Sequence, residues 1–206
     1  RTPRGFEIDQ LGRFSSRRDR PDPDARIAYR ARVRLVTWNV RRGGRRAARP
    51  IAEALVALDA AAVVLTEITA ACSPPLTEAL SARGWQHVRA TAPPPHEYGV
   101  FIASRSLLVQ RPFDEGPAPH RALMVDVEGS GVAIFGGYLP LPKQGQRTSD
   151  LQHRFWSWLL QVAKRLRNDA LLVAGDFNTC FGVDGAGRDL AGAKHLARLH
   201  GLGFRD

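Results

Sequence analysis

The stretch LLVAGDFNT, residues 171–179, is the most informative part of the 206-residue sequence. Its apolar part, Leu171–Ala174, predicts a short buried strand, and Gly175 allows another backbone to approach closely. Side chains alternate along an extended chain. If the extended conformation persists past Gly175, Asp176 and Asn178 point to one side and the phenylalanine between them points into the packing. A carboxylate and an amide so placed can orient a water and hold a phosphate oxygen; the structural alternative is an Asx turn.

Three more polar side chains stand at the ends of predicted strands: Asn39, Glu67 and Tyr138. The amide of Asn39 can ligate a hard cation through oxygen or orient a carboxylate, or it can simply cap a turn. Glu67 directly follows a buried strand, where a carboxylate is costly to desolvate unless it is paired or bound to a metal; the alternative is a solvated side chain. The phenol of Tyr138 could donate to a phosphate oxygen, or pack as an ordinary aromatic ring.

The chain as a whole alternates predicted strands and helices between Gly- and Pro-containing turns. The expected strands are 33–40, 62–66, 98–103, 123–127, 132–138 and 171–174, and the expected helices are 50–59, 74–83, 151–166 and 191–200. This order predicts a layered α/β fold with a mixed sheet. Residues 1–30 contain Arg-Asp runs, two prolines and no apolar periodicity, so we expect a basic, disordered tail before a single domain over 31–206.

The positive charge of the chain is concentrated in its first quarter. The net charge is +10, and residues 1–50 hold 15 Arg and five acidic residues, so they account for all of it. Such a region suits a polyanionic partner, such as nucleic acid or an anionic membrane surface, although a GC-rich genome also favours Arg over Lys. With 44% hydrophobic and 24% charged residues, the chain is not wholly disordered, collagenous or coiled coil.

Neither the apolar segments nor the cysteines indicate a membrane or a secreted protein. No run approaches the roughly 18 apolar residues of a membrane-spanning helix, and no secretory signal is recognisable. The two cysteines, Cys72 and Cys180, form no disulfide framework. We therefore expect a reduced, cytoplasmic setting.

In their order and spacing, the four strand ends resemble the endonuclease/exonuclease/phosphatase superfamily, and most closely its exonuclease III-like apurinic/apyrimidinic (AP) endonucleases. The matching stretches are TWNV with Asn39, VVLTEI with Glu67, YGVFIASR at 98–105, GGYLP with Tyr138, and LLVAGDFNT with Asp176 and Asn178. The resemblance covers about residues 33–206. Tyr138 carries the choice of subfamily, because the deoxyribonuclease I-like, sphingomyelinase and inositol-phosphatase branches usually have His at this place.

This resemblance implies a fold and a division of roles. The fold is a four-layer α/β sandwich, two mixed β-sheets flanked by helices, with the active site where the sheets meet at one edge. Glu67 would be the main Mg²⁺ ligand, with Asn39 beside it and Mn²⁺ as a substitute ion. Asp176 would orient or deprotonate the attacking water, Asn178 would help to place that water or a phosphate oxygen, and Tyr138 would donate to the phosphate. A hard cation and preorganised donors are what phosphodiester hydrolysis needs.

Four arginines follow Asn39 in a loop close to the expected site: Arg41, Arg42, Arg45 and Arg46. They could contact the phosphates of a nucleic-acid backbone, or remain solvated. The six histidines match no motif of the family, and we expect them at the surface or in the core.

The family also has a late Asp in a strand and an Asp-His pair near its C-terminus, and no counterpart is found before Asp206. We therefore expect the last strands of one sheet, and part of the site, to be missing from this chain. The leading hypothesis is a monomeric, Mg²⁺-dependent nuclease that acts on DNA in the manner of AP endonuclease or exonuclease repair enzymes. Two alternatives stay open: a phosphatase or phosphodiesterase for a phospholipid or sugar phosphate, and a catalytically inactive nucleic-acid-binding module.

Overall fold

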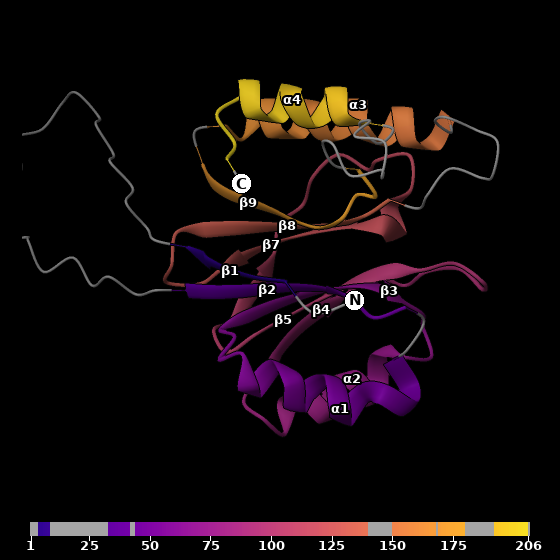
Figure 1. The fold of residues 1–206 in the computed structure, drawn as a ribbon, viewed down its shortest axis with the longest axis vertical. Coiled ribbons are helices and arrows are strands. Elements are labelled where there is room, and N and C mark those ends of the chain that lie inside the picture. The colour runs from indigo at the N-terminus through magenta and orange to yellow at the C-terminus, as the bar shows by residue number, and fades with distance from the viewer. Residues whose placement is uncertain are drawn as a thin grey trace, which may run out of the picture.

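Two β-sheets pack face to face, and helices cover the outer face of each sheet (Figure 1). The computed structural model describes residues 4–8, 33–41, 44–139, 150–167, 169–179 and 192–205. From bottom to top, Figure 1 shows two helices, the first sheet, the second sheet and two further helices. The predicted four-layer α/β sandwich is therefore confirmed.

The first sheet has five strands in the order β1-β2-β3-β5-β4. These strands are β1 (Arg4–Ile8), β2 (Val33–Asn39), β3 (Ala62–Ile68), β4 (His87–Ala90) and β5 (Gly99–Ser104). Strands β2 and β3 are parallel and are connected through helix α1 (Gly44–Ala57), whereas the other pairs are antiparallel. Helix α2 (Ser73–Ser81) lies beside α1 on the outer face (Figure 1).

The second sheet has four strands in the order β6-β7-β8-β9. These strands are β6 (Leu108–Gln110), β7 (Ala122–Val127), β8 (Val132–Tyr138) and β9 (Ala170–Asp176). A short 3-10 turn, η1 (Pro119–Arg121), leads into β7. Strands β8 and β9 are parallel, and helix α3 (Asp150–Arg165) lies between them in the chain. Helices α3 and α4 (Ala193–Gly201) cover the outer face, as Figure 1 shows.

Consecutive residues of the central strands divide between two layers of core, because strand side chains alternate. In β3, Val64 packs between the sheets while Leu65 packs toward α1 and α2. In β5, Ile102 and Phe101 divide in the same way. A strand buried on both faces reads as a continuous apolar run, which is why VVL and GVFIA show no polar alternation.

The structure differs from the sequence-based expectations near the N-terminus, at two short strands and at the start of one helix. Strand β1 lies within the segment expected to be a tail, and its backbone pairs antiparallel with β2 from Ile8 opposite Val33 to Arg4 opposite Thr37. Backbone pairing needs no apolar side-chain pattern, so composition could not indicate it. The rest of 1–30 lies outside the described residues. Strands β4 and β6 were not predicted, since four and three residues are too short for a periodic signal.

Helix α1 begins at Gly44, well before the expected start at Pro50. Its buried stripe begins at Ala48 and continues through Ile51 and Leu55 at helical spacing. Pro50 therefore sits inside the helix, where it removes one backbone hydrogen bond without ending the helix. None of the helices in the described ranges is both long enough and apolar enough to cross a bilayer.

Candidate active site

Three of the predicted site residues meet where the two sheets come together, although they are far apart in the sequence. Asn39 ends β2, Glu67 lies near the end of β3, and Asp176 ends β9. The side-chain nitrogen of Asn39, Nδ2, donates to Glu67 Oε1 at 3.0 Å and to Asp176 Oδ2 at 2.6 Å. The two carboxylates thus come from different sheets and are held side by side by a single amide group.

The backbone at Glu67 is distorted in a way that directs this side chain. Glu67 has a φ of 60°, and the pairing of β3 with β5 shifts register between Thr66 and Ile68. A bulge of this kind re-aims a side chain, and a left-handed non-glycine residue is costly to maintain. Local strain of this kind is typical of functional positions.

Asp176 is placed by the glycine that precedes it. Gly175 has a φ of 141°, and a Cβ built there would lie 1.9 Å from the carbonyl oxygen of Gly137 in β8. Only glycine lets the two strands run this close together. The register then sets Asp176 opposite Tyr138, and Leu139 N donates to Asp176 O at 2.8 Å.

The expectation that the extended conformation persists past Gly175 is wrong. Strand β9 ends at Asp176, and Asn178 has a φ of 47°. Asn178 N donates to Asp176 Oδ1 at 3.1 Å, which is the Asx turn considered as the alternative. Asn178 Nδ2 donates to Leu139 O at 2.7 Å, so this residue ties the loop to the end of β8. Phe177 packs as expected, with its ring against Trp156.

Tyr138 is buried at the end of β8, with 5% of its surface exposed. Burial, together with the nearby negative charge of Glu67, raises the pKa of Tyr138 to about 12. The phenol therefore keeps its proton at neutral pH and can act as a hydrogen-bond donor. Its ring contacts Tyr98 edge-on, with 6.2 Å between centroids. The guanidinium carbon of Arg121 lies 5.3 Å from its centroid. Arg121 was not singled out by the sequence, since one arginine before an apolar strand carries no distinguishing pattern.

Of the four predicted phosphate-contacting arginines, the structure describes the side chain of Arg41 alone. Arg41 is exposed, has a φ of 49°, and donates its backbone N–H to Asn39 Oδ1 at 2.9 Å. Arg42 lies outside the described residues. Arg45 and Arg46 belong to the first turn of α1 and not to a loop, and their side chains are not described.

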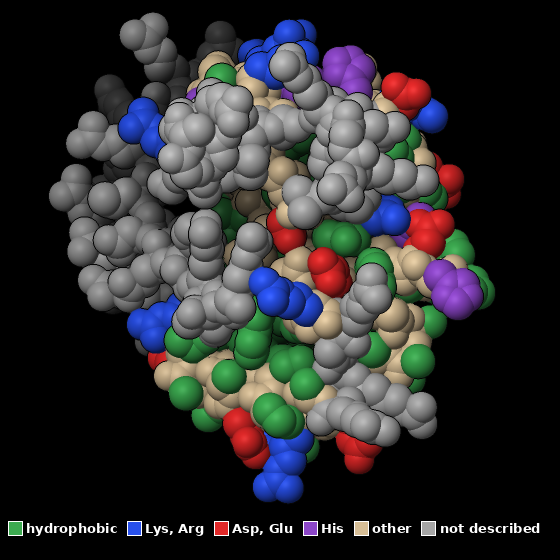
Figure 2. Space-filling model, turned by 45° about the vertical axis from the view of Figure 1, so that its right-hand side comes forward, with side chains coloured by type: hydrophobic (Ala, Val, Ile, Leu, Met, Phe, Trp, Pro, Cys, Tyr) green, Lys and Arg blue, Asp and Glu red, His purple; other side chains and the backbone are tan. Residues whose placement is uncertain are grey.

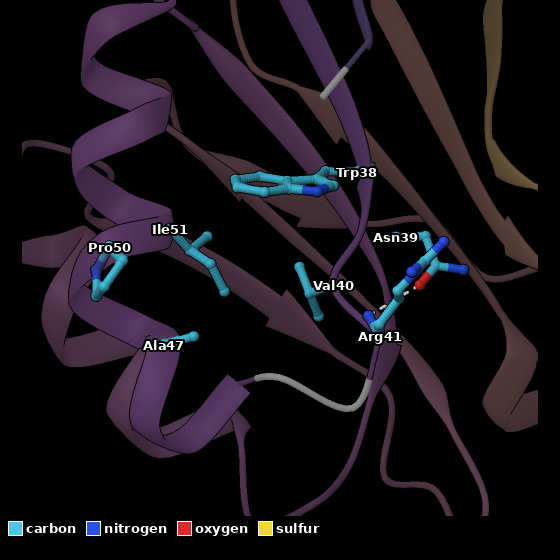
Figure 3. Close-up of a pocket in the computed structure, with 7 residues that line it drawn as sticks. All are labelled: Trp38, Asn39, Val40, Arg41, Ala47, Pro50 and Ile51. Atoms are coloured by element: carbon cyan, nitrogen blue, oxygen red, sulfur yellow. Dashed lines mark hydrogen bonds between the residues drawn. The ribbon is translucent and has the colours of Figure 1, made fainter. Parts of the chain in front are cut away.

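A pocket of about 320 Å³ adjoins the site between the end of β2 and α1. It is lined by Trp38, Asn39, Val40, Arg41, Ala47, Pro50 and Ile51. Figure 3 shows Trp38 and Val40 directed toward α1, whereas Asn39 points to the other side of β2. The face drawn in Figure 2 carries acidic and basic side chains close together near its middle, with hydrophobic side chains gathered below them around α1 and α2. The described surface on this face is thus of mixed charge.

The chemistry of the Asn39–Glu67–Asp176 cluster fits a hard divalent cation. Two carboxylates stand together, and among the residues that the structure describes neither is paired with Lys or Arg. One or two carboxylates with an amide and waters suit Mg²⁺. Within the described ranges, no group of three or more His, Cys, Asp or Glu side chains is placed to hold a metal ion. Asn39 turns its nitrogen to the carboxylates, and ligation through its oxygen stays a prediction.

The protein is thus a two-sheet α/β sandwich that has two carboxylates close together where its sheets meet. The sequence matches the profile of the Endonuclease/Exonuclease/phosphatase family over residues 36–204. The chain therefore belongs to this family of hydrolases. No curated protein sequence matches it significantly.

Several solved structures are similar to this chain. A 3'-5' exonuclease from Neisseria meningitidis is 21% identical with a TM-score of 0.62, covering 82% of this chain and 70% of that one. An AP endonuclease from Archaeoglobus fulgidus is 16% identical with a TM-score of 0.62, covering 84% and 72%. D. rerio TDP2 in complex with a single-strand DNA product is 19% identical with a TM-score of 0.57, covering 82% and 64%. At these identities the likeness concerns the fold.

Proposed function

We propose that the chain is a divalent-cation-dependent phosphodiester hydrolase that acts on DNA, in the manner of an exonuclease or AP endonuclease. One observation carries the proposal: Asn39 holds two carboxylates from different sheets together, at 3.0 and 2.6 Å, and no basic side chain of the described part neutralises them. Like charges so close favour a bound cation.

In this proposal each residue has one task. Glu67, beside Asn39, would hold Mg²⁺ or Mn²⁺, which when bound supplies a positive charge for the phosphate oxygens. Asp176 orients or deprotonates the attacking water, and it is fixed by Asn39 on one oxygen and by Asn178 N on the other. Asn178 places this loop and helps to position the water, and the Tyr138 hydroxyl donates a hydrogen bond to a phosphate oxygen.

DNA is proposed as the substrate on three grounds. Structures with this fold include an exonuclease, an AP endonuclease and a protein bound to a single-strand DNA product. The site has tyrosine at position 138, in keeping with the exonuclease III-like branch of the resemblance. Arg41 is exposed next to Asn39, and the first 50 residues carry the whole positive charge of the chain. We further propose that the protein is a monomer in the cytoplasm. The buried Cys72 forms no disulfide, which agrees with a reducing compartment.

The test is cleavage of an end-labelled DNA duplex with one abasic site, with MgCl₂ or with EDTA. Glu67→Gln and Asp176→Asn keep the shape of each side chain and should lower the rate by about 10²–10³-fold. Asp126→Asn is the matched control, because Asp126 is paired with Arg111 and should leave the rate within about twofold. Equal rates in all four proteins, or equal rates in EDTA, would contradict the proposal.

The same proteins separate the two alternatives. A chain that hydrolyses phospholipid or sugar-phosphate substrates faster than DNA is a different hydrolase with the same site. A binding module without activity would bind DNA in a salt-sensitive way that survives both carboxylate substitutions.

A further inference from the structure

Arg121 is a buried cation that lies over the ring of Tyr138. It closes the turn η1 and has 8% of its surface exposed. Its Nη2 donates to Glu97 Oε2 at 2.9 Å, and its guanidinium carbon lies 5.3 Å from the ring centroid of Tyr138. Its Nε and Nη1 are buried and have no hydrogen-bond partner in the described part of the chain. The guanidinium of Arg121 thus lies over the ring of Tyr138, and two of its three nitrogens have no hydrogen-bond acceptor in the described part of the chain.

This arrangement is unusual for a buried arginine. Guanidinium groups are always charged, and their donors are costly to leave unpaired away from water. Arg111, which is partly exposed, is paired more fully, since its donors reach both Asp126 and Asp169. An aromatic face attracts a cation but replaces hydrogen bonds only in part. A buried residue whose unpaired donors lower the stability of the fold is expected to have a role in the functional site.

The surroundings hold Arg121 in place from several directions. Thr91 Oγ1 donates to His120 O at 2.7 Å, which fastens the turn to the neighbouring strand region. Glu97 Oε2 lies 2.7 Å from His120 Nε2 as well as accepting from Arg121. Burial raises the pKa of Glu97, but the hydrogen bond from Arg121 and the charge of His120 outweigh it and hold the pKa below its usual value. The carboxylate therefore stays charged and keeps the guanidinium fixed.

We propose that Arg121, fixed by Glu97, is a positioning residue that holds the ring of Tyr138 so that its hydroxyl faces the Glu67–Asp176 site. This inference rests on the proposed function. The free donors of Arg121 are buried, so it acts through the ring and not by touching the substrate. Tyr138 is the register partner of Asp176, so the orientation of its ring sets where its hydroxyl stands relative to that carboxylate.

The kinetic test is a double-mutant cycle on the DNA-cleavage assay. Arg121→Met should lower kcat by about ten- to hundredfold with KM nearly unchanged, because a misplaced donor weakens the transition state. Arg121→Lys should recover part of this loss, since a cation remains over the ring while the fork to Glu97 is lost. In a Tyr138→Phe background, Arg121→Met should add less than about threefold. Arg111→Met is the control and should leave kcat unchanged.

Two kinetic results would overturn the inference. Effects of Arg121→Met and Tyr138→Phe that multiply would mean that Arg121 acts independently of the phenol. An unchanged kcat in Arg121→Met would mean that the cation has no positioning role.

A second readout does not need activity. The chain has three tyrosines, Tyr29, Tyr98 and Tyr138, so ring-labelled protein gives few NMR signals, which single Tyr→Phe variants assign. Arg121→Met should move the Tyr138 ring signal, whereas Arg111→Met should not. A Tyr138 signal unmoved by Arg121→Met contradicts the inference. If the wild-type chain cleaves no phosphodiester, the proposed function fails, and this spectrum alone decides the positioning of Tyr138.

Discussion

A pair of carboxylates lies at each end of β9, and only one of the two pairs is neutralised by an arginine of the described chain. Before the start of the strand, Asp169 and its neighbour Asp126 share Arg111, whose nitrogens lie 2.6 Å from each carboxylate. At the other end, Asp176 and Glu67 share only the neutral amide of Asn39. A carboxylate pair that serves the fold is neutralised by the chain itself. The Glu67–Asp176 pair has no basic partner among the described residues, so it is suited to bind a cation from solution.

The largest expected effect concerns the glycine that sets the site end of β9. Gly175→Ala should lower the free energy of unfolding by about 4 kcal/mol or more, because its Cβ would strike Gly137 O. Gly129→Ala is the matched control: Gly129 also has a positive φ, of 74°, but open space around it. There only the left-handed backbone is strained, at about 1 kcal/mol. Urea unfolding of both variants measures the difference, and equal losses would mean that close approach of β8 and β9 does not matter.

The imidazole of His195 is buried and stays neutral, unlike the charged carboxylate pairs at the ends of β9. It is fully buried on α4, stacked on Trp156, and burial followed by the charges of Lys194 and Arg198 lowers its pKa to about 4. The unfolded chain takes up this proton near pH 6.5, before the folded chain does. Stability is therefore complete above pH 6.5 and falls as the pH drops toward 4, by about 3 kcal/mol.

Unfolding at pH 7 and pH 4.5 in wild type and His195→Gln checks this expectation. The variant should lose clearly less stability on acidification than the wild type. An equal acid loss in both proteins would assign the effect to other groups.

A divalent cation should stabilise the folded chain through the uncompensated pair. At ten times its dissociation constant, Mg²⁺ should add about 1.4 kcal/mol. Thermal unfolding with and without MgCl₂ measures this gain. Glu67→Gln should abolish the gain and Asp126→Asn should keep it, and the reverse pattern would place the cation at the other end of β9.

The smallest change in the free energy of unfolding is expected when one carboxylate of each pair is replaced by the neutral amide. Asp126→Asn should cost about 1 kcal/mol, because Arg111 loses a charged acceptor at a half-exposed site. Asp176→Asn should cost less than Asp126→Asn, since relief of the repulsion from Glu67 offsets the loss of one of the two hydrogen bonds that the Asp176 oxygens accept. Chemical unfolding of both variants at neutral pH tests whether the two pairs truly differ.

Sequence patterns were most informative where side chains alone report the structure. The apolar runs located the strands that carry the site, and their polar ends named Asn39, Glu67, Tyr138 and Asp176, all of which lie at or beside one cluster. The patterns failed where the backbone decides. Strand β1 is held by pairing with β2, and the turn at Asn178 is held by hydrogen bonds to Asp176 and Leu139.

The residue types of this chain determine its layered α/β fold and the chemistry at the ends of its strands, because burial periodicity and polar punctuation are local properties. Which polar groups compensate one another is decided by the tertiary structure. Asn39 and Asp176 are 137 residues apart, and only the packing of one sheet on the other brings them within 2.6 Å. The same packing sets Arg121 against the ring of Tyr138 and gives Arg111 its two carboxylates. Distances between sheets depend on how their side chains interdigitate, and no one-dimensional pattern contains that information.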